Sequence, residues 1–209
     1  TAKLVVCGEG LSFIGFPKVL LPENNILVSL QATLCLLDLM SINRVFTQSS
    51  YELLIEAIEK VHVPGRLEQV IHTAQHDVFL DVGHNPHAAI YLKEFLMQYA
   101  DTNTFIQIVY SSLSDKDVLG VLQHLSSVAD RCVLTQLSCD RAMPLENLAT
   151  LALESGFESI EKYSDANEAF NSALNYPNRS IESQGRVITL ILGSFFMVEA
   201  AKRFLKSYD

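Results

Sequence analysis

An acid, an imidazole and an amide follow one another closely in the run Asp81-Val-Gly-His-Asn-Pro-His. The apolar residues before Asp81 predict a buried strand, and Pro86 opens a helix whose free N–H groups face the same junction. Open α/β sheets bind nucleotides and anions at such strand-to-helix junctions. The Asp81 carboxylate could therefore accept both hydroxyls of a ribose, or it could only complement the helix that follows.

His84 and Asn85 carry different weight in this turn. Asn85 before Pro86 is a good helix start, which explains both residues structurally. An imidazole is not needed for packing in a turn, so His84 could be a hydrogen-bond donor, an acid/base group or a metal ligand. Only His87 lies near it among the six histidines, and no pair has a known metal spacing, so we expect no metal site in this chain.

Two basic residues could bind anions. Arg66 follows Pro-Gly, where its planar fork would suit a phosphate chain between two domains; the alternative is a surface ion pair with Glu68. Lys116 opens a predicted helix, where the helix dipole disfavours a cation unless an anionic ligand shares the site; a solvated lysine is the alternative. We expect Asp115 to cap that helix, with Asp117 in its first turn.

Ser194 lies between a predicted strand and the last helix. It is the expected N-cap of that helix, and the same hydroxyl and N–H groups could instead hold a carboxylate. Since Asp81, Asn85, Lys116 and Ser194 all follow strands, a parallel sheet would bring the four to one edge.

The elements that must position these residues alternate between strand and helix. After a boundary between about residues 63 and 72, this pattern predicts an α/β domain with a mostly parallel sheet and helices on both faces. We expect strands at 77–81, 105–110, 131–137, 158–163 and 186–192, helices at 86–99, 117–129, 144–155, 166–175 and 195–206, and a loop at 176–185. Before the boundary we expect two short strands within 3–17 and helices at 26–40 and 50–61.

Composition limits the possible partners and compartment. The net charge of −9 argues against binding nucleic acid or anionic lipid. Four cysteines without C-x-x-C spacing predict free thiols, buried at positions 7, 35 and 132, in a reducing cytoplasm. No apolar run approaches the roughly 20 residues that span a membrane. The 209 residues also contain no G-x-x-x-x-G-K-[ST] loop for a triphosphate.

Two segments together resemble the family of folylpolyglutamate synthase/dihydrofolate synthase within the Mur ligase superfamily. Val63-Pro-Gly-Arg-Leu67 is similar to its interdomain P-G-R segment, and Phe79–Ala89 to its D-x-A-H-N-P-H-A-A signature. Weaker matches are the D-K-D element at 115–117, the G-S-F element at 193–195, and Leu21-Pro22 with the helix near Gln31. The resemblance implies a Rossmann-like C-terminal domain at 66–209, preceded at 1–65 by the end of the central ATPase domain.

The resemblance also implies a reaction and roles for individual residues. It implies an ATP-dependent ligase that adds L-glutamate to dihydropteroate or a folate through an acyl phosphate. Gln31, Arg66 and Asp81 would contact ATP; Asn85, Lys116 and Ser194 would hold glutamate, and His84 would be catalytic. Mg²⁺ is implied with ligands in the missing N-terminal part, which would be a partner of this otherwise monomeric chain, and the chain alone would be inactive.

Three departures from the family pattern and two alternatives accompany this interpretation. Gly83 replaces an Ala, Gln31 an Asn, and Ser111 a frequent Gly.

Replacing Asp81 is expected to raise the KM for ATP and leave folding nearly intact. The alternatives are a non-catalytic nucleotide-binding module and a fragment of a peptidoglycan Mur ligase. The string His-Asn-Pro-His at 84–87 argues against the peptidoglycan ligase only.

Overall fold

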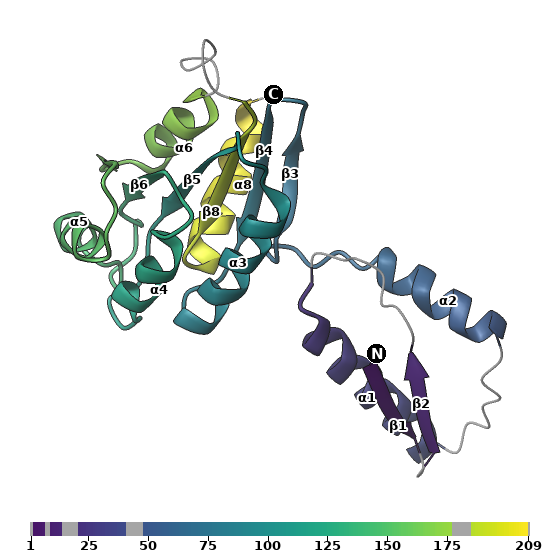
Figure 1. The fold of residues 1–209 in the computed structure, drawn as a ribbon. Coiled ribbons are helices and arrows are strands. Elements are labelled where there is room, and N and C mark those ends of the chain that lie inside the picture. The colour runs from purple at the N-terminus through teal and green to yellow at the C-terminus, as the bar shows by residue number, and fades with distance from the viewer. Residues whose placement is uncertain (1, 7–8, 14–20, 41–47, 177–184, 209) are drawn as a thin grey trace. The chain divides into compact units, whose positions relative to one another are not determined.

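The chain divides into two compact units, Thr1–Val63 and Pro64–Asp209 (Figure 1). The computed structural model describes residues 2–6, 9–13, 21–40, 48–176 and 185–208. Cys7 and most of the predicted loop at 176–185 lie outside these residues. No helix in the described part of the chain is both long and apolar enough to cross a membrane.

The first unit pairs two antiparallel strands, β1 (Ala2–Val6) and β2 (Glu9–Phe13), and adds the helices α1 (Glu23–Leu39) and α2 (Gln48–Glu59). Helix α1 begins three residues before the predicted start, because the Pro22 carbonyl already accepts N–H bonds from Asn25 and Ile26. That first turn is polar, so an apolar pattern cannot reveal it.

Only part of the apolar surface of this unit is covered within the unit. Ile26, Leu34 and Ile58 are buried, whereas Leu36, Leu39 and Leu53 are exposed. The free thiol of Cys35 is also exposed, so the expectation of a buried thiol there was wrong. An apolar run does not show which side of a helix each of its residues occupies, and Cys35 lies on the side of α1 that faces away from the small core.

The second unit is a six-stranded sheet in the order β3-β4-β8-β5-β6-β7, parallel except for the edge strand β3. Its strands are β3 (Glu68–His72), β4 (His76–Asp81), β5 (Phe105–Tyr110), β6 (Arg131–Thr135), β7 (Ile160–Tyr163) and β8 (Val187–Leu192). Its helices are α3 (Pro86–Tyr99), α4 (Val118–Leu125), α5 (Leu145–Glu154), α6 (Ala166–Leu174) and α8 (Phe195–Tyr208). The predicted α/β class with a mostly parallel sheet is confirmed.

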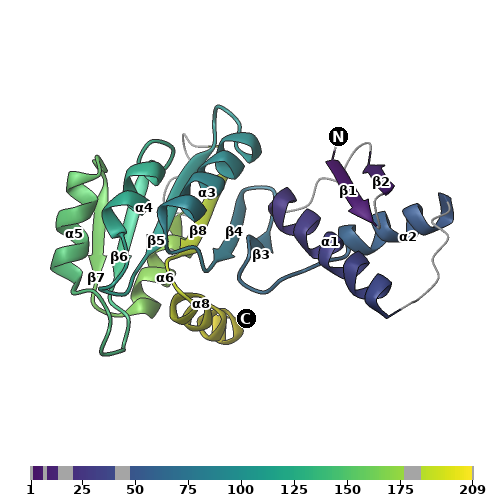
Figure 2. The ribbon, with the colours of Figure 1, turned by 90° about the horizontal axis from the view of Figure 1, so that it is seen from below.

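Helices cover both faces of this sheet, as Figure 2 shows for α3 and α4 on one side and α8 on the other. Helices α3, α4 and α5 bury apolar side chains against Phe79, Ile108 and Leu190. Helices α6 and α8 pack on the opposite face, against Val109 and Ile191. This two-faced burial explains why β4, β5, β6 and β8 read as continuous apolar runs.

Strand β3 was not predicted. It pairs antiparallel with β4, its side chains are mostly half-buried, and its register shifts between Gln69 and Ile71. A short edge strand with an irregular register carries only a weak alternating pattern, which is why the sequence does not reveal it.

Several boundaries differ from the predicted ones by a few residues. Helix α4 ends at Leu125 instead of 129, β6 ends at Thr135 instead of 137, and β7 begins at Ile160 instead of 158. The predicted caps at Asp165 and Ser194 are present, since Asp165 accepts the N–H of Asn167 and the Ser194 hydroxyl accepts that of Met197.

Candidate functional site: the carboxyl edge of the parallel sheet

Three neighbouring strands end at the same level. Asp81 at the end of β4 and Tyr110 at the end of β5 both pair with Leu192 at the end of β8. The segments that follow these strands therefore leave the sheet side by side. Asp81 ends β4, and the segments that follow the strands carry His84, Asn85, Lys116 and Ser194, so the topology brings these five predicted site residues to one edge.

The segment around Arg66 is clamped on both sides. Gly65 and Leu67 both have positive φ angles, of 69° and 44°. The Gly65 carbonyl accepts the Val82 N–H (2.8 Å), and the Leu67 N–H donates to Asp81 Oδ2 (2.8 Å). Leu67 is buried, and Arg66 between them is exposed. A positive φ at a buried leucine is unfavourable and persists only where the surroundings hold it, so this segment has a fixed shape that presents Arg66 to solvent.

The alternative ion pair of Arg66 with Glu68 does not form. Glu68 Oε2 instead accepts the Gly65 N–H (2.6 Å) and pairs with Lys202 (2.7 Å). Among the described residues, none forms a hydrogen bond or an ion pair with the Arg66 guanidinium, whose charge does act on Asp81. The guanidinium is therefore available to an anionic ligand.

Asp81 is more buried than the sequence suggested. Its side chain ties two backbone segments together, because Oδ2 accepts the Leu67 N–H and Oδ1 the Gly83 N–H (2.6 Å). Burial raises the pKa of this carboxyl, and these two N–H bonds and the charge of Arg66 oppose that rise. A Cβ atom at position 83 would lie 2.8 Å from Oδ1, so the departure from Ala to Gly gives this carboxylate its room.

The ring of His84 is held in one orientation. Its Nδ1 lies 2.9 Å from the Val82 carbonyl oxygen. Since a carbonyl can only accept, Nδ1 must carry the hydrogen, and Nε2 keeps its lone pair in the neutral ring. His84 is half-buried, so Nε2 can act as a proton acceptor or a hydrogen-bond acceptor.

Asn85 caps α3 as predicted. Its Oδ1 accepts the Ala88 N–H at 2.9 Å, and the residue is exposed. The cap uses the oxygen, so the NH₂ group of the same amide keeps two donors that the cap does not use.

The loop before α4 differs from the prediction. Asp117, not Asp115, caps the helix, with Oδ1 accepting the Gly120 N–H at 2.9 Å. Asp115 instead pairs with Lys116 (3.0 Å) and with Arg141 (2.8 Å). Two aspartates two residues apart cannot be told apart as caps from the sequence, because the choice depends on where the loop is anchored. The Lys116 ammonium is thus paired with Asp115 and not only solvated, and 30% of its side chain is exposed.

Ser194 and Gly193 form a tight junction between β8 and α8. Ser194 is buried, and its hydroxyl accepts the Met197 N–H at 3.1 Å. Gly193 has a φ of 121°, and a Cβ atom there would lie 1.8 Å from the Ser111 carbonyl oxygen. Only glycine fits this position. The Ser111 hydroxyl is buried without a partner among the described residues, and nothing in the structure explains why serine stands there.

Gln31 belongs to the other unit. It is half-buried on α1, and its side-chain amide donates to Cys35 Sγ at 3.3 Å. Its assignment to the nucleotide therefore stays a prediction.

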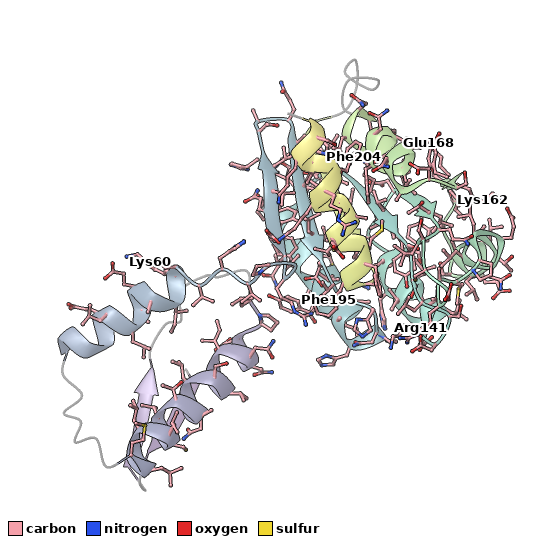
Figure 3. All side chains as sticks on the ribbon, turned by 180° about the vertical axis from the view of Figure 1, so that it is seen from behind. Lys60, Arg141, Lys162, Glu168, Phe195 and Phe204 are labelled. Carbon is pink, nitrogen blue, oxygen red and sulfur yellow. The ribbon has the colours of Figure 1, made fainter. Side chains whose placement is uncertain are left out.

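Arg141 is a basic residue at this edge that the sequence reasoning passed over. It follows β6 in the next loop, so the rule that residues after parallel strands meet at one edge would also have selected it. Its backbone carbonyl accepts the Ser114 N–H at 2.9 Å, which joins its loop to the Lys116 loop. Figure 3 places Arg141 and Phe195, the neighbour of Ser194, toward the same end of this unit.

Among the described residues, the predicted site residues at the edge coincide neither with a groove nor with a cluster of metal ligands. A groove of about 490 Å³ lies between the loop after β6, the start of α6, and α8, and none of the predicted site residues lines it. In the described ranges, no group of three or more His, Cys, Asp or Glu side chains could hold a metal ion. The edge therefore offers cations, amides and hydroxyls, a set of groups suited to phosphates and carboxylates.

Comparisons with known proteins agree with this geometry. Residues 65–193 match the family model described as "Mur ligase, glutamate ligase domain". The dihydrofolate synthase/folylpolyglutamate synthase of Buchnera aphidicola subsp. Schizaphis graminum is 33% identical over 147 residues, which are 68% of this chain and 31% of that protein.

Solved structures of the same kind superpose on the chain. Mycobacterium tuberculosis folylpolyglutamate synthase, complexed with ADP and AMPPCP, aligns with a TM-score of 0.72 and 26% identity over 90% of this chain and 41% of that one. The bifunctional synthase of Yersinia pestis, complexed with AMPPNP and Mn ion, aligns with a TM-score of 0.71 and 25% identity over 96% of this chain and 42% of that one. The chain thus spans about a third to two fifths of the length of these relatives. On the match over 65–193 together with the edge geometry, the chain belongs to the Mur ligase family and carries its glutamate ligase domain.

Proposed function

We propose that this chain is the glutamate-adding portion of an ATP-dependent ligase that joins L-glutamate to dihydropteroate or to a folate. The observation that carries the proposal is the shared level at which β4, β8 and β5 end, which gathers cationic and amide groups on one edge. The names of the relatives, all dihydrofolate synthase/folylpolyglutamate synthases, supply the substrate class. They favour the folate branch over a peptidoglycan ligase.

The nucleotide would meet the clamped linker. Arg66 would contact the phosphates with its guanidinium, which has no hydrogen-bond or ion-pair partner in the described part of the chain. Asp81 would accept ribose hydroxyls through the lone pairs that its two N–H partners leave free. The nucleotide complexes of the M. tuberculosis and Y. pestis relatives support a nucleotide here. The resemblance makes Gln31 a further proposed contact of the nucleotide.

The incoming glutamate would lie along the edge. Lys116 and Ser194 would hold its carboxylates, and the NH₂ group of Asn85 would donate to the same substrate. The bound ATP supplies the phosphoryl group that turns the carboxylate of the acceptor into an acyl phosphate. His84 Nε2, which keeps its lone pair, would take a proton from the glutamate amine as that amine attacks the acyl carbon, whose bond to oxygen breaks to release inorganic phosphate.

Divalent metal use is supported by the Mn ion in the Y. pestis complex, and we infer Mg²⁺ in the cell. Its ligands would come from the part of the relatives that this chain does not span, which is more than half of their length. On the same reasoning the chain alone would be inactive.

The test is an ADP-release assay on the full-length protein with ATP, Mg²⁺, L-glutamate and either dihydropteroate or tetrahydrofolate. We expect glutamate-dependent ADP formation, and Lys116→Ala should raise the KM for glutamate about tenfold while the KM for ATP stays unchanged. Lys162→Ala is the matched control, because Lys162 is a half-exposed lysine that pairs with Glu146 and lies on β7, the edge strand that β6 separates from β5. Absence of ADP with both acceptors would favour the non-catalytic module instead.

A further inference from the structure

Arg141 and Lys116 share one carboxylate. Asp115 Oδ1 accepts from Arg141 Nη2 at 2.8 Å, and Asp115 Oδ2 lies 3.0 Å from Lys116 Nζ. Each oxygen of the carboxylate thus faces a different cation. The arrangement is a chain of three charges along the edge, with Lys116 at one end and Arg141 at the other.

Backbone hydrogen bonds fix the loops that carry these residues. The Ser114 N–H donates to the Arg141 carbonyl, the Met143 N–H donates to the Ser112 carbonyl (both 2.9 Å), and Leu113 and Ala142 form an isolated antiparallel bridge. An exposed ion pair on free loops is worth little, because ordering two side chains costs entropy. Here the backbones are already aligned, so Arg141 faces Asp115 as a consequence of the fold.

The charges of the three side chains explain what Arg141 could do. Hydrogen bonds from Lys116 and then from Arg141 lower the pKa of Asp115 to about 2, so this carboxylate is ionised at neutral pH. Without Arg141, Asp115 would neutralise Lys116 and would repel an anionic substrate. With Arg141 the three charges sum to one positive charge, which leaves an attractive field beside Lys116.

We propose that Arg141, acting through Asp115, is a positioning residue that keeps Lys116 effective toward a carboxylate of the incoming amino acid. This inference rests on the proposed function. Arg141 offsets the charge of the Asp115 carboxylate, so that the neighbouring Lys116 ammonium keeps its attraction for an anion. Arg141 therefore sets the affinity for a dicarboxylic amino acid without contacting the reacting atoms.

Arg141→Gln in the full-length protein tests the proposal. We expect the KM for glutamate to rise about three- to tenfold, with kcat and the KM for ATP unchanged, and Arg141→Lys to recover most of the loss. Arg203→Gln is the matched control. Arg203 is also an exposed arginine in an ion pair, with Glu199, and its neighbour Phe204 lies toward the opposite end of α8 from Phe195 (Figure 3).

A double variant separates charge compensation from a loss of structure. Asp115→Asn combined with Arg141→Gln again leaves one positive charge, so the KM for glutamate should return to within about twofold of the parent value. The rise in the KM for glutamate caused by Arg141→Gln alone should also shrink as salt is raised from 0.05 to 0.5 M. Screening weakens the repulsion between the Asp115 carboxylate and the carboxylates of glutamate.

The outcomes are distinct. An unchanged KM for glutamate in Arg141→Gln, in a parent enzyme that does form ADP, overturns the inference and leaves the proposed function standing. A raised KM that the double variant and salt do not correct shows a structural role and also overturns it. If the parent forms no glutamate-dependent ADP, the proposed function fails and the inference falls with it.

Discussion

Asp81 shows how one side chain can serve two purposes at a site edge. Its two oxygens hold the N–H groups of Leu67 and Gly83, which lie on either side of the strand end. It therefore fixes the linker that presents Arg66 and the turn that carries His84. The expectation that its loss would leave folding nearly intact has to be revised, because removing it leaves two inward-facing N–H groups without their acceptor.

Asp81→Ala should lower the free energy of unfolding of the chain by about 2 kcal/mol. Urea unfolding followed by circular dichroism measures the change, and Asp140→Ala, at an exposed aspartate, is the control that should change it by less than about 0.5 kcal/mol. Equal stability of the two variants would mean that water replaces the carboxylate at both N–H groups, and that Asp81 acts only on ligands.

At the scale of elements, the junction between β8 and α8 decides where the edge lies. Gly193 lets the end of β8 approach the end of β5 so closely that no side chain fits between them. The approach sets the start of α8 and with it the place of Ser194. The loops before α4 and α5 are joined by backbone hydrogen bonds, so these two segments of the edge are held to each other.

Gly193→Ala should cost about 3 kcal/mol or more of unfolding free energy, since it adds a steric clash with the Ser111 carbonyl to an unfavourable φ. Gly156→Ala is the matched comparison. Its φ is 99°, but the nearest atom to a Cβ there is 3.8 Å away, so only the backbone term of about 1–2 kcal/mol applies. Similar losses in the two variants, measured by urea unfolding, would show that the close approach at Gly193 relaxes freely.

At the scale of the whole molecule, a polar chain that is buried except at Glu161 crosses the sheet of the second unit. Thr189 lies 2.7 Å from His76 Nε2 and accepts from Gln107 Nε2, and Arg131 bonds both Gln107 and Glu161. The chain joins all five parallel strands. Burial lowers the pKa of His76 to about 4, against which the nearby Asp77 acts.

This pKa predicts an acid-sensitive fold. The unfolded chain binds a proton at His76 below about pH 6.5, while the folded chain resists it down to about pH 4. The unfolded state thus binds more protons in that window, so the contribution of His76 to stability is complete above pH 6.5 and is lost as the pH falls toward 4. His76→Gln should flatten the fall in urea midpoint between pH 7 and pH 4.5. The exposed His87→Gln should leave it unchanged, and parallel curves for all three proteins would refute the assignment.

The sequence by itself determined the alternation of elements in the second unit and the family to which it belongs. Strand β5 and helix α3 begin and end where their apolar runs and the Asn85-Pro86 start predict, because these signals are local. The order of strands along the chain also sufficed to place Asp81, Asn85, Lys116 and Ser194 at one edge, since parallel strands share a direction.

Only the tertiary structure decided the partners of those residues. It shows that Asp117 and not Asp115 caps α4, that Glu68 pairs with Lys202 and not with Arg66, and that β3 closes the sheet. It also brings Arg141 to Asp115, 26 positions away in sequence. Such pairings depend on which loops the strand order makes neighbours and on how closely backbones approach, and neither quantity is contained in the local pattern of residue types.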